Sequence, residues 1–298
     1  MPSRRHELLA YLVPRLKKSG ELVTPEHERA RIIAWHNGLD RSLPTKAVPR
    51  FGRRFSVVRD DSAGFPTYVI TPRHVRPTRT LFYVHGGAYN APIDAFHVRY
   101  ATLLARAVGA RVVMPDYPLA PEHTWRDSFD AMTTSAARWA EEPMVLTGDS
   151  AGGGYALALA LALRDRGGPQ PTHLVLHAPW VDLTTSTPET ETVTLTDPWL
   201  FIGKVRAYAE WWAGSPEDLG RPEVSPVFGS LAGLPPALLM YGTRDTIAPG
   251  CRLLTARSVE DGWDLSVIEE PGFIHVYSLL PFVPEARRAF RQTIAFLG

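Results

Sequence analysis

The fold is decided by one stretch, MVLTGDSAGGGYALALALAL, which spans residues 144–163. It begins with an apolar run that is typical of a buried strand and ends in an alanine- and leucine-rich run that is typical of a helix. Between the two runs lies the pentapeptide GDSAG, residues 148–152. A strand-to-helix turn this tight strains the backbone of its central residue, so the residues two positions away must be small. The two outer glycines meet that need, and we expect Ser150 to stand above the end of a sheet.

Outward from this stretch, short β-rich runs alternate with segments of helical pattern from residue 55 onward. This alternation predicts an α/β fold with a mostly parallel sheet covered by helices. The predicted strands are 80–84, 111–114, 144–147, 173–177, 237–241 and 265–269, and the predicted helices are 97–108, 127–141, 151–166, 251–261 and 284–296. Segments 55–58 and 67–70 flank a turn-rich run and predict an opening hairpin.

Composition sets the broad class of the protein. The chain has 298 residues, of which 45% are apolar and 21% are charged, so one folded domain is expected. Lys and Arg number 32 against 31 Asp and Glu, a formal charge of +1. Such a balance gives no strong field toward nucleic acid or an anionic membrane. We therefore expect a small partner that is uncharged overall.

The single cysteine, Cys251, excludes an intrachain disulfide and a cysteine-rich metal cluster, and it fits a reducing cytoplasm. Pro14 and the pair Lys17-Lys18 interrupt the apolar positions near the N-terminus, so we expect no secretory signal peptide. No run of 18 apolar residues occurs, and we expect no membrane span.

Two segments depart from the alternation, residues 1–50 and about 183–227. The second begins with the polar run 184–192, which predicts a loop. An aromatic-rich helical pattern follows. It is too apolar for an isolated surface helix, so we expect it to pack over another part of the protein. Its apolar members are Leu200, Val205, Tyr208, Trp211 and Trp212.

The pentapeptide also suggests chemistry. A hydroxyl held at the positive end of a helix is placed to attack a carbonyl carbon, so Ser150 is a candidate nucleophile. The sequence HGGA at 85–88 follows a predicted strand and would expose backbone amides. Amides of Gly86, Gly87 and Ala151 are the predicted donors to a developing oxyanion. The structural alternatives are a close-packed glycine turn at 148–152 and a β-turn at 85–88.

A serine nucleophile of this kind needs a carboxylate and then a histidine later in the chain. His173 and His177 belong to the next predicted strand, which leaves His275, in the predicted loop after 265–269. Asp245 follows the strand at 237–241 and would orient the imidazole. The alternatives are a structural histidine, a helix-capping aspartate, or an acid closer to His275, namely Asp264, Glu269 or Glu270.

Together these residues resemble the hormone-sensitive-lipase-like carboxylesterases of the α/β-hydrolase fold, from about residue 65 to the C-terminus. The matching motifs are HGGAY at 85–89, DYPLAPEH at 116–123, GDSAGG at 148–153, Ser225-Pro226, LPP at 234–236, Asp245 and His275. The resemblance implies a Ser-Asp-His carboxylesterase that uses no cofactor or metal and acts on short- to medium-chain acyl esters. It also implies one α/β-hydrolase domain over 1–298, with an eight-stranded sheet and a helical cap from 1–50 and about 183–227. Family members often pair through the sheet edge near the C-terminus, which would make a homodimer.

Three positions depart from the family pattern. Pro118 replaces the arginine of the Tyr-Arg-Leu-Ala-Pro-Glu motif, so polar contacts from that arginine are absent. Ala88 stands at the third position of the oxyanion loop. The run 245–249 keeps the acid and loses a second carboxylate.

The substrate pocket is the least specified part. Aromatic side chains that could form its wall are Tyr89, Phe201, Tyr208, Trp211 and Trp212. The alternative is that they only pack the cap onto the body. The same triad could also serve an amidase, a lactonase or an acyltransferase. A non-catalytic binding protein is a further alternative, against which the presence of His275 argues.

Overall fold

The computed structural model describes residues 1–16 and 20–298. Eight strands form one sheet in the order β1-β2-β4-β3-β5-β6-β7-β8. The β1–β2 and β2–β4 pairs are antiparallel and the others parallel, which confirms the predicted mostly parallel sheet and its opening hairpin. The strands are β1 (Phe55–Asp60), β2 (Thr67–Pro72), β3 (Arg79–Val84), β4 (Ala110–Pro115), β5 (Met144–Asp149), β6 (His173–His177), β7 (Ala237–Arg244) and β8 (Leu265–Ile274).

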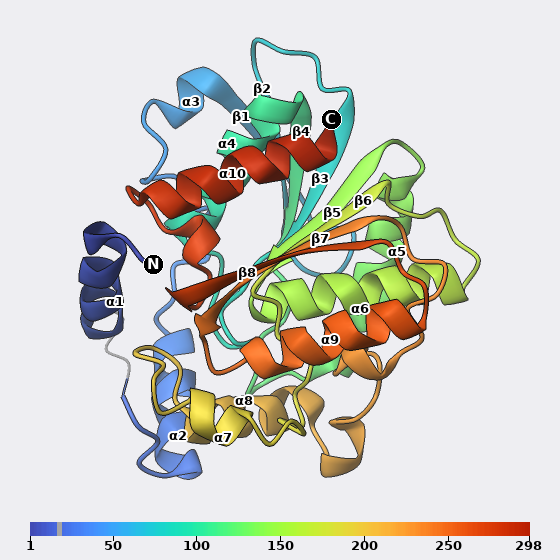
Figure 1. Cartoon of the computed structure of the whole chain (residues 1–298). Coiled ribbons are helices and arrows are strands. Elements are labelled where there is room, and N and C mark those ends of the chain that lie inside the picture. The colour runs from blue at the N-terminus through green and yellow to red at the C-terminus, as the bar shows by residue number, and fades with distance from the viewer. Residues whose placement is uncertain (17–19) are drawn as a thin grey trace.

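Helices cover both faces of the sheet, and Figure 1 shows the two layers. One face carries α4 (Ala95–Val108) and α10 (Pro284–Leu297), and the other carries α5 (Phe129–Ala140), α6 (Ala151–Asp165) and α9 (Ala248–Glu260). Because helices cover both faces, the central strands are buried along nearly their whole length, as in β3 and β5. The remaining helices are α1 (Arg4–Leu16), α2 (Pro25–His36), α3 (Phe51–Arg54), α7 (Thr190–Val193) and α8 (Ile202–Ala213).

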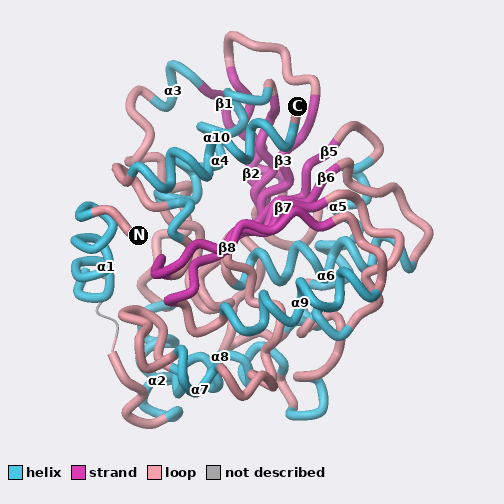
Figure 2. The backbone as a smooth tube through the Cα atoms, viewed as in Figure 1, coloured by secondary structure: helices cyan, strands magenta, loops and turns pink. Residues whose placement is uncertain are grey.

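The two segments outside the alternation attach at several places. Helices α2, α7 and α8 lie together at one end of the molecule, whereas α1 lies beside the tip of β8 (Figure 2). Glu28 of α2 joins α2 to α8, because it accepts a hydrogen bond from Tyr208 and lies 3.3 Å from the Lys204 ammonium. Val48 instead packs in the core between the sheet and α4. The polar run 184–192 is loop except where α7 begins.

Two details of the N-terminal region bear on the sequence predictions. The pair Lys17-Lys18, which argued against a signal peptide, lies outside the described residues. Among the residues that the structure does describe, no helix combines the length and apolar character that crossing a membrane requires.

Candidate active site

Ser150 occupies the turn between β5 and α6 with φ of +53°, a conformation that L-residues rarely adopt. The turn is possible because its neighbours are glycines. A Cβ on Gly148 would lie 2.3 Å from the Gly152 carbonyl oxygen, and one on Gly152 would lie 2.2 Å from the Val84 carbonyl oxygen. The Ser150 side chain is partly exposed at the end of the sheet.

Asp245 and His275 meet because of the pairing between β7 and β8. Both strands run further than predicted, and across a bulge Arg244 pairs with Ile274. The next residue of each strand is therefore Asp245 or His275, side by side at the same edge. This corrects the predicted loop at 271–275, since β8 continues to Ile274 and His275 follows it directly.

The three side chains form a chain of hydrogen bonds. The Asp245 Oδ2 and His275 Nδ1 atoms are 2.8 Å apart, and His275 Nε2 lies 2.8 Å from Ser150 Oγ. Asp245 Oδ1 also accepts a bond of 3.1 Å from the Ile247 amide, and both Asp245 and His275 are buried. With the Nδ1 proton donated to the carboxylate, Nε2 is free to accept the Ser150 proton.

Charge around His275 shifts its acid–base behaviour. Burial alone lowers the pKa of the imidazole, but the Asp245 carboxylate, with a smaller contribution from Asp197, holds that pKa above its usual value. Asp197 belongs to the insertion after β6 and was not singled out from the sequence. Its Oδ2 accepts a 2.7 Å bond from the Thr246 amide, so it holds the loop that carries Asp245. The sequence around Asp197 gives no sign of this role, because the role depends on a contact with the distant residue Thr246.

The other histidines and acids lie elsewhere. His177 is held between Tyr100 and Ser278, and burial lowers its pKa to about 4. His85 stacks on Tyr117 at 4.4 Å, and burial lowers its pKa to about 3, so it remains neutral. Of the rival acids, Glu269 bonds Arg252, Glu270 bonds Arg288 and Asp264 is exposed.

The loop after β3 requires a correction. The Gly86 amide donates a 3.2 Å hydrogen bond to Asp149 Oδ1, which also accepts a 2.7 Å bond from the Tyr83 hydroxyl. The predicted role of Gly86 as an oxyanion donor is therefore wrong for this arrangement, because its only N–H is engaged. Within the described chain, the amides of Gly87, Ala88 and Ala151 donate no hydrogen bond. Ala88 takes the place of Gly86 as the third candidate donor.

The five candidate pocket aromatics separate into two groups. Tyr89 and Trp212 are 1% and 0% exposed and stack on each other with ring centroids 4.3 Å apart. Their burial favours the packing interpretation. Phe201, Tyr208 and Trp211 are only partly buried, and Tyr208 is tied to Glu28 of α2.

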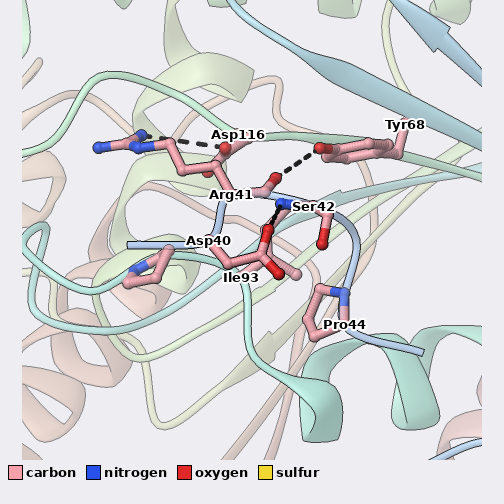
Figure 3. A pocket seen from close by; sticks show the side chains of 8 residues that line it. Asp40, Arg41, Ser42, Pro44, Tyr68, Ile93 and Asp116 are labelled. Carbon is pink, nitrogen blue, oxygen red and sulfur yellow. Dashed lines mark hydrogen bonds and ion pairs between the residues drawn. The ribbon is translucent and has the colours of Figure 1, made fainter. Parts of the chain in front are cut away.

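A separate small pocket lies beside Asp116, which directly follows β4 (Figure 3). The Asp116 side chain is 2% exposed, and its nearest cation is Arg41, at 3.9 Å. Burial raises the Asp116 pKa to about 6, although the charges of Arg41 and Arg59 oppose the shift. The guanidinium beside Asp116 therefore comes from the N-terminal segment and not from the 116–123 motif, in which Pro118 replaces the arginine.

Comparisons with known proteins bear on the family of the chain. Residues 81–279 match the sequence model of a family described as alpha/beta hydrolase fold. The chain is 33% identical over 272 residues to a putative acetyl-hydrolase, LipR, of Mycobacterium tuberculosis, covering 89% of this chain and 86% of that one. It is also 33% identical to an acetyl-hydrolase of Streptomyces hygroscopicus, over 78% of this chain and 82% of the relative.

Solved structures of an esterase and of a putative esterase superpose on this chain. A crystal structure of an esterase from the bacterial hormone-sensitive lipase family superposes with a TM-score of 0.79 and 26% identity, covering 100% of this chain and 98% of that one. A putative esterase from Staphylococcus aureus superposes with a TM-score of 0.81 over 91% of this chain and 90% of its own, and at 22% identity it supports the fold alone.

Proposed function

This chain belongs to the hormone-sensitive-lipase-like family of α/β hydrolases and is a carboxylic ester hydrolase, and on that premise we propose that it cleaves short- to medium-chain acyl esters through an acyl-enzyme on Ser150. The observation that carries the proposal is the pair of 2.8 Å contacts that link Asp245, His275 and Ser150. A nucleophile, a base and an orienting acid in hydrogen-bond contact are what acyl transfer requires.

In the first half-reaction, Ser150 Oγ bonds to the ester carbonyl carbon while its proton moves to His275 Nε2. The carbonyl π electrons move to the oxygen, where the amides of Gly87, Ala88 and Ala151 are the proposed donors. When the tetrahedral intermediate collapses, the C–O bond to the alcohol breaks and the alcohol takes the proton from His275. The acyl group remains on Ser150.

In the second half-reaction, water attacks the acyl carbon and gives a proton to His275 Nε2. The Ser150 Oγ–acyl bond then breaks, the carboxylic acid leaves, and Ser150 recovers its proton. Asp245 stays ionised throughout and stabilises the imidazolium that forms in each half-reaction.

The proposed acyl preference rests on the relatives. Two of them are named acetyl-hydrolases, which favours a short acyl group here.

Ser150→Ala tests the proposal. The variant should lose turnover of nitrophenyl esters by several orders of magnitude, because no other group supplies the nucleophile. It should also lose labelling by a fluorophosphonate probe, which reacts with an activated serine. Near wild-type turnover by the variant would refute the role of Ser150. A parallel panel of amides, lactones and acceptor alcohols measures the other reactions open to the same triad.

A further inference from the structure

The turn that carries the proposed oxyanion donors is strained. Gly87, Ala88 and Tyr89 all have positive φ, at +114°, +52° and +59°. Left-handed backbone costs roughly 1–2 kcal/mol for each residue with a side chain, so two in a row persist only where the surroundings hold them. We call residues 87–90 the oxyanion turn.

Contacts at two successive carbonyls hold the oxyanion turn from outside. The Tyr89 carbonyl accepts a 2.8 Å bond from the Ala120 amide. The next carbonyl, that of Asn90, lies 2.7 Å from Nε2 of His36, the last residue of α2. His36 therefore reaches from the N-terminal segment to the turn that carries the Gly87 and Ala88 amides.

The second nitrogen of the same ring is also engaged. His36 Nδ1 lies 3.0 and 2.9 Å from the two carboxylate oxygens of Glu122, in the segment that also contains Ala120. The His36 side chain is only 5% exposed. Arg29 makes a further link between α2 and this segment, donating a 3.3 Å bond to the Pro121 carbonyl.

Both ring nitrogens thus face oxygen acceptors. Each nitrogen lies within hydrogen-bond distance of its acceptor, so one buried ring connects the oxyanion turn to the Glu122 carboxylate. The ring therefore adds a side-chain bridge between the oxyanion turn and the segment that carries Glu122, beside the Ala120–Tyr89 backbone bond.

We propose that His36 is a positioning residue for the reaction: it holds the oxyanion turn so that the Gly87 and Ala88 amides stay aimed at the developing oxyanion. His36 does not touch the substrate and acts through the Asn90 carbonyl. This inference rests on the proposed function, because the turn matters to rate only if acyl transfer occurs at Ser150.

His36→Gln tests the inference, with His27→Gln as matched control. Both histidines belong to α2, but the His27 side chain is exposed. Losing one oxyanion donor outright costs about 10²–10³ in rate, so a displaced turn in His36→Gln should lower kcat about tenfold. KM should stay within about twofold, because the ground-state ester does not depend on the oxyanion donors. His27→Gln should match the wild type.

A transition-state analogue separates positioning from general damage. A trifluoromethyl ketone adds to the serine and places an oxyanion against the same amides, so its Ki should rise in His36→Gln by the same factor as kcat falls. Glu122→Gln removes the charge from a partly exposed side chain, and this variant should fold. Its kcat should fall and its Ki for the ketone should rise, as in His36→Gln. The double variant should lose no more than His36→Gln, because the two side chains act as a unit.

Several results would overturn the inference. An unchanged kcat and Ki in both single variants would do so, as would a raised KM at constant kcat or a lowered kcat at constant Ki. Should His36→Gln fail to fold, Glu122→Gln decides by the same two measurements. Failure of the proposed function gives a different result, namely activity that survives Ser150→Ala.

Discussion

The His275 imidazole is subject to two opposing influences. Burial favours its neutral form, whereas the Asp245 carboxylate favours the protonated form and prevails, so the pKa of His275 is raised. Only the neutral ring can accept the Ser150 proton. The activity of the free enzyme should therefore fall as the pH drops through this raised pKa, which lies above the ordinary value of 6.5.

Asp245→Asn tests the orienting role. The variant should lose about 10³–10⁴-fold in kcat, because an amide no longer fixes the imidazole with its proton on Nδ1. The acid limb of its pH profile should also move to lower pH, since burial then acts on His275 without the Asp245 charge. The measurement is kcat/KM against pH.

The matched control is Asp264→Asn, at an exposed rival carboxylate on the chain before β8. It should keep the wild-type profile. An Asp245→Asn variant with an unshifted acid limb, or an Asp264→Asn variant with an equal loss, would assign the acid elsewhere.

Helix α8 shows how an element of the insertion joins the body. Trp212 is fully buried, stacked on Tyr89 and 6.2 Å from the Tyr117 ring, whereas Trp211 on the same helix is only partly buried. Consecutive side chains lie about 100° apart around a helix, and these two therefore meet different environments. Trp212 links α8 to the oxyanion turn through Tyr89.

Trp212→Ala should lower the free energy of unfolding by about 3–5 kcal/mol, the usual cost of removing a large buried aromatic side chain. The preference across nitrophenyl esters of increasing acyl length should remain as in the wild type if the ring only packs the core. Denaturant unfolding and the ester panel measure the two effects. Trp211→Ala is the comparison and should cost less stability. A shift toward longer acyl chains in Trp212→Ala, without loss of stability, would instead place the ring in the pocket wall.

At neutral pH the buried Asp116 carboxylate lowers the stability of the folded protein. Its pKa is raised by burial from 3.8 to about 6, so the folded state binds its proton more tightly than the unfolded chain does. This loss of stability is absent below pH 3.8, the pKa of the carboxyl in the unfolded chain. It grows as the pH rises toward 6, the pKa in the folded protein, and is complete above about pH 6. Two pKa units correspond to roughly 3 kcal/mol.

Asp116→Asn should therefore stabilise the protein by up to roughly 3 kcal/mol near pH 8 and by almost nothing near pH 4. The lost ion pair with Arg41 should matter little, because that guanidinium is 40% exposed. Urea unfolding at both pH values measures the difference. Asp40→Asn, at an exposed carboxylate of the same pocket, should show no such gain. An equal gain for Asp116→Asn at both pH values would contradict the titration argument.

Segments outside the α/β alternation reach all three loops of the site. His6 of α1 accepts a 3.3 Å bond from the Ile274 amide beside His275, His36 of α2 reaches the Asn90 carbonyl, and Asp197 of the insertion accepts from Thr246 beside Asp245. The prediction that residues 1–50 and about 183–227 form a cap stays a prediction, as do the homodimer and the cytoplasmic location. Through these contacts, both segments hold backbone groups next to the proposed catalytic residues.

The sequence by itself determined the sheet, its helices and the order of Ser150, Asp245 and His275, because hydrophobic period and glycine spacing are local properties of the chain. It could not determine that β7 and β8 extend to the Arg244–Ile274 pair, since a bulge depends on both strands together. Nor could it show that Asp149 engages the Gly86 amide, that Tyr89 and Trp212 stack, or that His36 meets the oxyanion turn. The last three contacts join residues more than 50 positions apart, and only tertiary packing decides which distant groups meet.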